Sequence, residues 1–120
     1  AEPGVASIVA LSEAFLSYVE RRVFPGGCFF AALTAEFGPR SGAVKERIVE
    51  YYDEWLALFE ELVVQARDRG ELAADVDPVQ VAFELDAILY GANALFVLKD
   101  DERAFDHARR AIRERLDASR

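Results

Sequence analysis

The sequence is short of the residues on which disulfide, metal and histidine chemistry depend. Its single cysteine, Cys28, excludes a disulfide within the chain and fits a reducing compartment. Its single histidine, His107, has no second histidine and no cysteine at the spacing of metal ligands. No Glu-x-x-His pair and no Ser-His-Asp or Cys-His arrangement is visible. We therefore expect no metal site, no cofactor and no enzymatic activity, with His107 at the surface or packed in an interface.

Basic residues are also scarce, since 14 Lys and Arg stand against 22 Asp and Glu, giving a net charge of −8. This balance repels a phosphate backbone, so the chain by itself is a poor candidate for binding nucleic acid. We find no signal peptide, and the uncharged run from Ala87 to Leu98 is too short to span a bilayer. We expect a cytoplasmic protein that does not contact membranes. The sequence starts at Ala1 without an initiator Met, so we expect it to be a piece of a longer protein.

Alternation with a period of two, which strands require, is missing as well. Apolar residues instead recur at helical spacing, and the length of 120 residues suits one domain with its own core. We predict a single all-α domain, 1–120, with five helices. The predicted helices run over 5–22, 28–37, 41 to about 69, 77–98 and 101 to about 116.

Breaks and caps separate these helices. Phe24-Pro25-Gly26-Gly27 interrupts the chain after the first helix, and Gly70 suits the position just after the third. Ser41 is a candidate cap for the third helix, and Asp100 or Asp101 for the fifth. Asp77-Pro78 opens the fourth helix with an N-cap side chain followed by proline at the first helical position.

The fourth predicted helix carries three stripes, so we expect it to be covered on more than one face. One stripe is large and apolar, and a second is small, with Ala87, Gly91 and Ala94. The third is polar, with Asp86, Tyr90 and Asn93 at i, i+4 and i+7. A small stripe lets another helix approach closely, whereas a polar stripe must be solvated, paired with protein groups or exposed to a cavity.

Three segments resemble the C-terminal half of TetR-family transcriptional regulators. They are YVERRVFPGGCFF (18–30), the long Trp55-bearing helix ending in RGEL (69–72), and ADVDPVQVAFELDAILYGAN (74–93), with an amphipathic helix behind it. Their order and spacing carry the resemblance, which covers nearly the whole chain from Val5 onward. The helix-turn-helix domain with which such regulators begin is absent here, so DNA binding is implied only for a longer parent chain.

The resemblance implies an effector-binding and dimerisation domain whose last two helices pair with those of a second subunit in a four-helix bundle. The small stripe and the apolar face of the last helix would form that seam. The predicted dimer interface consists of Ala87, Gly91, Ala94, Phe105, Ala108, Ile112 and Leu116.

The resemblance also implies that the preceding helices enclose a pocket for a small molecule, which the many aromatic residues predict to be largely apolar. The predicted ligand-binding residues are Phe15, Tyr18, Phe29, Tyr52, Trp55, Phe59, Asp86, Tyr90 and Asn93. Two alternatives stay open: Asp86 and Asn93 could cap or cross-link helices or lie in the dimer seam, and the aromatic residues could be ordinary core. Cys28 could be a redox sensor or simply a small apolar residue.

Three functions compete at this stage. The first is the ligand-sensing, dimerising domain of a TetR-like regulator, with a repressor favoured over an activator. The second is an oligomerisation or adaptor module without a ligand, and a less favoured third is an enzyme built in a helical bundle. The first function requires a cavity inside the domain, whereas the adaptor requires only a solid core.

The charge of the chain yields a prediction about DNA. We expect the purified 120-residue protein not to bind duplex DNA, because its charge of −8 opposes the counterion release that drives such binding. An electrophoretic mobility assay at low salt tests this expectation. A salt-sensitive shift of the duplex would contradict it.

Overall fold

The computed structural model describes residues 4–24 and 26–120, apart from the side chain of Phe30, so the predicted break at Pro25 lies outside the described residues. Within these residues the chain forms helices and no strand. The helices are α1 (Val5–Glu20), α2 (Phe29–Phe37), α3 (Ala43–Asp68), α4 (Pro78–Lys99) and α5 (Arg103–Asp117). The predicted all-α fold is confirmed.

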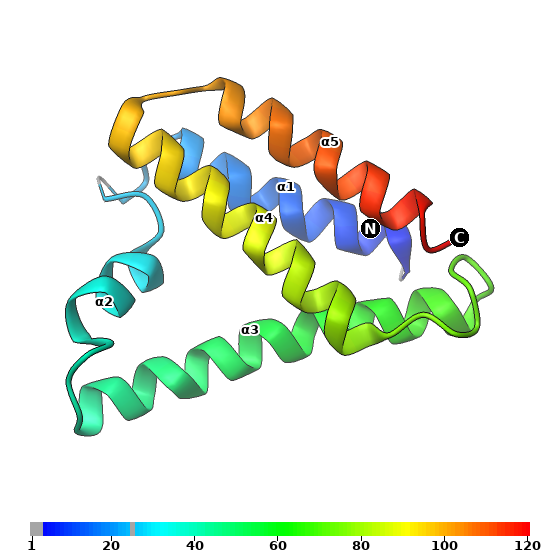
Figure 1. The fold of residues 1–120 in the computed structure, drawn as a ribbon, viewed down its shortest axis with the longest axis horizontal. Coiled ribbons are helices and arrows are strands. Elements are labelled where there is room, and N and C mark those ends of the chain that lie inside the picture. Colours follow the sequence, from blue (N-terminus) through cyan, green and yellow to red (C-terminus); the bar gives the residue numbers. More distant parts are fainter. Residues whose placement is uncertain (1–3, 25) are drawn as a thin grey trace.

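Helix α4 lies at the centre of the fold, in contact with α1, α3 and α5 (Figure 1). The helices α1, α4 and α5 lie side by side, and the long α3 crosses α4 on one side of this layer. The short α2 stands at one end, against the first half of α3. At the opposite end, the Ala73 N–H donates to the Ser119 carbonyl at 2.7 Å, which joins the α3–α4 loop to the end of the chain.

The ends of the helices follow local chemistry. The Asp77 carboxylate accepts the N–H groups of Val79 and Gln80 at 3.1 and 3.2 Å, as its predicted N-cap role requires. Gly70 has φ +77°, the left-handed conformation that glycine adopts without strain after a helix. The predicted cap Ser41 is wrong, because α3 begins after Gly42 and has no side-chain cap.

The core is one cluster shared by α1, α3, α4 and α5. The largest of its fully buried side chains are Phe59 of α3 and Phe105 of α5. On α4, Leu85, Leu89 and Phe96 lie in this cluster and belong to the large apolar stripe. Because α4 is covered by three helices, it has little freedom to shift without disturbing all of them.

The apolar face of α5 requires a correction to the predicted dimer interface. Phe105, Ala108, Ile112 and Leu116 are only 1–4% exposed, and the Phe105 ring packs 4.7 Å from the Phe96 ring, centroid to centroid. These four side chains are occupied by the chain's own core, because α5 packs against α1 and α4 of the same chain. They therefore offer no surface to a second subunit.

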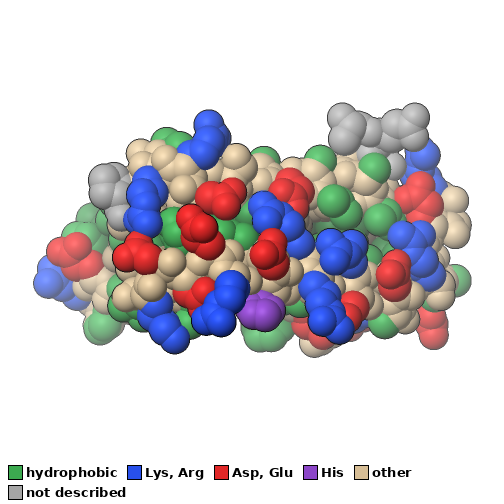
Figure 2. All heavy atoms as spheres, turned by 90° about the horizontal axis from the view of Figure 1, so that it is seen from above, with side chains coloured by type: hydrophobic (Ala, Val, Ile, Leu, Met, Phe, Trp, Pro, Cys, Tyr) green, Lys and Arg blue, Asp and Glu red, His purple; other side chains and the backbone are tan. Residues whose placement is uncertain are grey.

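The outer side of α5 is charged rather than apolar. Figure 2 shows acidic and basic side chains interspersed over this face, with His107 among them. Arg109 bonds to Glu13 of α1 at 2.8 Å, and Arg115 bonds to Glu84 of α4 at 2.7 Å. Partly exposed pairs of this kind contribute little stability, about 0.2–1 kcal/mol each, but they fix how α5 sits on its neighbours.

Helix α4 is long and apolar enough to cross a membrane by length and composition, and no other helix among the described residues passes that test. The uncharged second half, 87–98, is too short to span a bilayer, and only the whole helix of 22 residues meets the test. The core helix of a soluble protein gives the same signal, and α4 carries Glu84 and Asp86 near its middle and buries its apolar stripe in the core.

Candidate functional site

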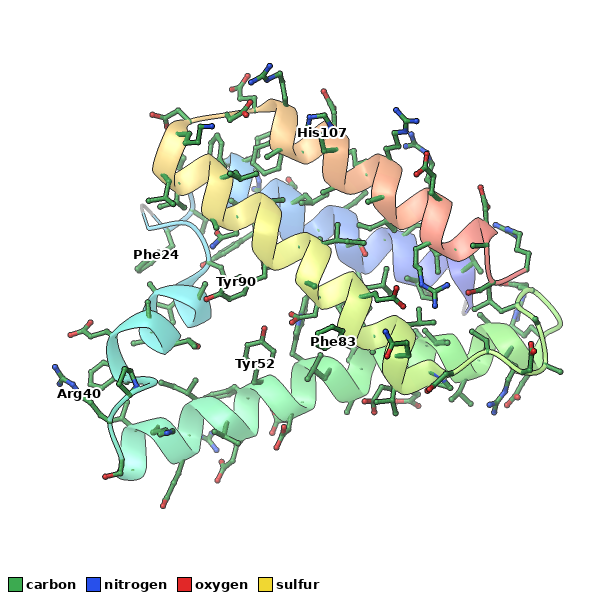
Figure 3. All side chains as sticks on the ribbon, in the orientation of Figure 1. Phe24, Arg40, Tyr52, Phe83, Tyr90 and His107 are labelled. Carbon is green, nitrogen blue, oxygen red and sulfur yellow. The ribbon has the colours of Figure 1, made fainter. Side chains whose placement is uncertain are left out.

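A cavity of about 520 Å³ lies among α1, α2, α3 and α4. Figure 3 shows Tyr52 of α3 and Tyr90 of α4 directed into the space between these helices and α2. The lining is mostly aromatic, with few polar groups, which is the usual make-up of a small-molecule site. The lining residues are Phe15, Tyr18, Cys28, Phe29, Ala31, Tyr51, Tyr52, Glu54, Trp55, Leu58, Asp86, Leu89 and Tyr90.

Most of the predicted ligand-binding residues meet at this cavity. Seven of the nine line it, namely Phe15, Tyr18, Phe29, Tyr52, Trp55, Asp86 and Tyr90. They come from four helices that are far apart in the sequence. Their role in binding stays a prediction, but their common position around one cavity is a feature of the fold.

Asp86 is the polar centre of the cavity wall. Its Oδ2 accepts the Tyr52 hydroxyl at 2.7 Å, and its Oδ1 accepts the Trp55 indole N–H at 3.2 Å. Burial, followed by the hydrogen bond to Asp86, raises the pKa of Tyr52 well above its ordinary value. The Tyr52 hydroxyl therefore keeps its proton and donates a hydrogen bond to the carboxylate, which cross-links α3 to α4.

Aromatic rings form the wall beside this cross-link. The Trp55 ring lies 5.8 Å from the Phe15 ring and 5.0 Å from the Phe59 ring, centroid to centroid. Phe59 does not line the cavity, so its predicted ligand contact is wrong. It is fully buried and stands edge-on behind Trp55, where α3 enters the shared core.

Asn93 is the second predicted ligand residue that lies away from the cavity. It is 5% exposed, and its Oδ1 accepts the backbone N–H of Cys28 at 2.7 Å. A Cβ at the neighbouring Gly27, which has φ +82°, would collide with Asn93 and Val97. Asn93 therefore holds the start of α2 against α4, which is the cross-linking role that the sequence analysis left open.

The cavity also includes residues that the sequence analysis did not select. On α3, Tyr51, Glu54 and Leu58 share one face with Trp55 at i, i+3, i+4 and i+7, so helical spacing from Trp55 would have found them. Cys28, the residue just before α2, and Ala31 within α2 are three residues apart and both contribute to the wall. Leu89 was assigned only to the apolar core.

The cavity wall carries two carboxylates, Asp86 and Glu54, and one thiol, Cys28. Within the part of the chain that the structure describes, no group of three or more His, Cys, Asp or Glu is arranged to hold a metal ion. A second hollow of about 470 Å³ adjoins the first across Phe29 and Tyr51. Its basic residue, Arg47, bonds to Glu50 at 2.6 Å and to the Tyr51 hydroxyl at 3.0 Å.

Comparison with known proteins connects this geometry to a family. Residues 4–112 match the family model described as the tetracyclin repressor-like C-terminal domain. The match runs from the residue before α1 to the second half of α5 and includes every helix that lines the cavity. The comparison with curated proteins gave no match to the chain.

The position of Asn93 yields a prediction about stability. Asn93→Leu should lower the free energy of unfolding by about 1–3 kcal/mol, because it removes the acceptor of the part-buried Cys28 N–H. Urea unfolding followed by circular dichroism measures the change. Asn93→Asp keeps an acceptor oxygen in place and should lose less stability. Equal unfolding midpoints for the wild type and Asn93→Leu would contradict the proposed role.

Proposed function

Because the chain belongs to the family of tetracyclin repressor-like C-terminal domains, we propose that it senses a small, largely apolar molecule for a dimeric transcriptional regulator of repressor type. The observation that carries this proposal is the cavity that α1, α2, α3 and α4 line. An adaptor module without a ligand has no use for such a cavity, whereas an effector needs one.

The size and lining of the cavity support a small organic ligand. A volume of about 520 Å³ falls within the range of sites that enclose drug-sized molecules, about 300–1,000 Å³. Seven of its thirteen lining residues are aromatic, which provides large flat apolar walls. Asp86 supplies one fixed polar position among them.

An exposed apolar face on α4 supports dimerisation. Ala87 and Gly91 of the predicted small stripe are exposed, and Ala94 is half-buried. Phe83, 62% exposed, and Leu98, 80% exposed, extend this face along the helix. Apolar surface of this length on a helix favours a second helix as its cover, and the small residues would let that helix come close.

Signal transmission would follow from the position of α4. One side of α4 lines the cavity through Asp86 and Tyr90, and the adjacent side carries the exposed face. A ligand that fits one arrangement of α4 better than another would shift the population of dimer geometries. The regulator would work in the cytoplasm and contact DNA through an N-terminal domain outside these 120 residues.

Filling the cavity provides the first test. Ala31→Phe places a ring at a buried position of the wall and should weaken binding of the neutral dye Nile red by about tenfold, because it occupies the ligand's space. Nile red fluorescence at increasing protein concentration measures the affinity. Ala32→Phe makes the same change at the next, exposed position and should leave binding unaltered. Absence of dye binding by the wild type, or equal binding by both variants, would reject the pocket.

The exposed face on α4 provides a second test. Wild-type protein should sediment as a dimer at roughly ten micromolar, since an adequate interface gives at least this affinity. Gly91→Leu should shift it toward monomer, because the added side chain would block close approach of the partner helix.

Gly91→Leu should leave the fold of the single chain intact, because a Cβ at Gly91 meets nothing within 4 Å in the same chain. Ala57→Leu, at an exposed position of α3, serves as the control and should leave the dimer intact. A monomeric wild type, or a Gly91→Leu variant that dimerises normally, would show that this face is not the contact.

A further inference from the structure

The polar groups of the cavity wall differ in how many hydrogen-bonding positions they leave free for a ligand. The Tyr52 hydroxyl and the Trp55 N–H are both used as donors to Asp86. Each carboxylate oxygen of Asp86 accepts one of these bonds, and an ionised carboxylate has about four acceptor positions in total. The wall at this point therefore offers negative charge and acceptor capacity, while the donors of Tyr52 and Trp55 are already engaged.

The charge of the lining points the same way. Among the described residues that line the cavity, Asp86 and Glu54 are carboxylates and none is Lys, Arg or His. The basic residue Arg47 belongs to the adjoining hollow, where Glu50 balances its charge at 2.6 Å. An anionic ligand would therefore meet two carboxylates without a cation to offset them, and a cationic ligand would be attracted to both.

The aromatic walls add to this preference. Faces of Tyr, Trp and Phe rings attract organic cations, most strongly where water is excluded. Trp55 and Phe15 pack together beside Asp86, and Tyr90 comes from the same helix as Asp86. An ammonium group at Asp86 would thus have aromatic rings close by, and the apolar body attached to it would cover the remaining walls.

From these observations we propose that the cavity selects an organic cation, an ammonium or amidinium group on an aromatic or other bulky apolar body, with Asp86 as its counter-ion. This inference rests on the proposed ligand-sensing function and specifies its chemical class. The ammonium N–H groups bond to the unused acceptor positions of Asp86, while Tyr52 and Trp55 hold the carboxylate in place.

Three probes with one body and different head groups test the charge preference. They are 4-phenylbenzylammonium, the neutral 4-biphenylmethanol and the anionic 4-biphenylcarboxylate. Trp55 is the only tryptophan and lines the cavity, so quenching of its fluorescence reports binding, and calorimetry confirms the dissociation constants. Salt of about 0.15 M screens the distant surface charges. The ammonium should bind about tenfold or more tightly than the alcohol, and the carboxylate most weakly.

Variants assign the preference to a residue. Asp86→Asn should weaken ammonium binding about tenfold or more and change alcohol binding by less than about twofold, so the alcohol reports within the same variant that the cavity is intact. Glu54→Gln removes a charge from an exposed position and should have a small effect. Tyr52→Phe leaves the charge of Asp86 and frees an acceptor position, so ammonium binding should persist.

Each other outcome decides against part of the proposal. Equal binding of ammonium and alcohol, or tighter binding of the carboxylate, would overturn the cation class while leaving the pocket in place. Loss of the preference in Glu54→Gln but not in Asp86→Asn would overturn the role of Asp86. If no probe binds while Nile red does, the cation class fails alone; if Nile red also fails to bind, the ligand-sensing function fails with it.

Discussion

The structure depends on the coverage of α4 by its neighbours. This helix is packed against α1, α3 and α5, so any polar side chain on its covered sides needs a partner from another element. Three such side chains have different partners. Glu84 forms an ion pair with Arg115 of α5, and Asn93 accepts the backbone N–H of Cys28 before α2. Asp86 accepts hydrogen bonds from Tyr52 and Trp55 of α3. These three polar side chains of α4 thus determine where the other elements attach.

These attachments also explain why a cavity can persist in the domain. Near its start α2 is attached to α4 through Asn93, and it also packs against α3. Asp86 meanwhile holds α3 at a fixed distance from α4 through two long aromatic side chains. The space between these two attachments is bordered by large rigid rings, which cannot fold into it as flexible aliphatic chains could. The cavity follows from polar cross-links placed on either side of it.

Sequence periodicity predicted the helices because their apolar spacing and their caps agree, as at Asp77 and Gly70. Helical spacing placed Asp86, Tyr90 and Asn93 on one stripe of α4. It could not show that Asp86 and Tyr90 line the cavity, whereas Asn93 bonds to the backbone before α2. Phe59 follows Trp55 by one turn, yet that turn carries it from the cavity wall into the core. The positions of Asn93 and Phe59 both depend on how the helices lie relative to one another. Periodicity along one helix carries no information about that arrangement.

The apolar face of α5 is a second feature whose position could not be predicted from helical spacing alone. An amphipathic helix must bury its apolar face, but the sequence does not state whether its own chain or a second copy provides the cover. Here α1 and α4 of the same chain provide it, leaving α5 with a charged outer face. Helix α4, in contrast, keeps an exposed apolar face with Phe83 and Leu98, and the neighbouring side of α4 carries the cavity residues Asp86 and Tyr90. A ligand that shifts α4 would therefore act on the proposed dimer contact directly, without passing through α5.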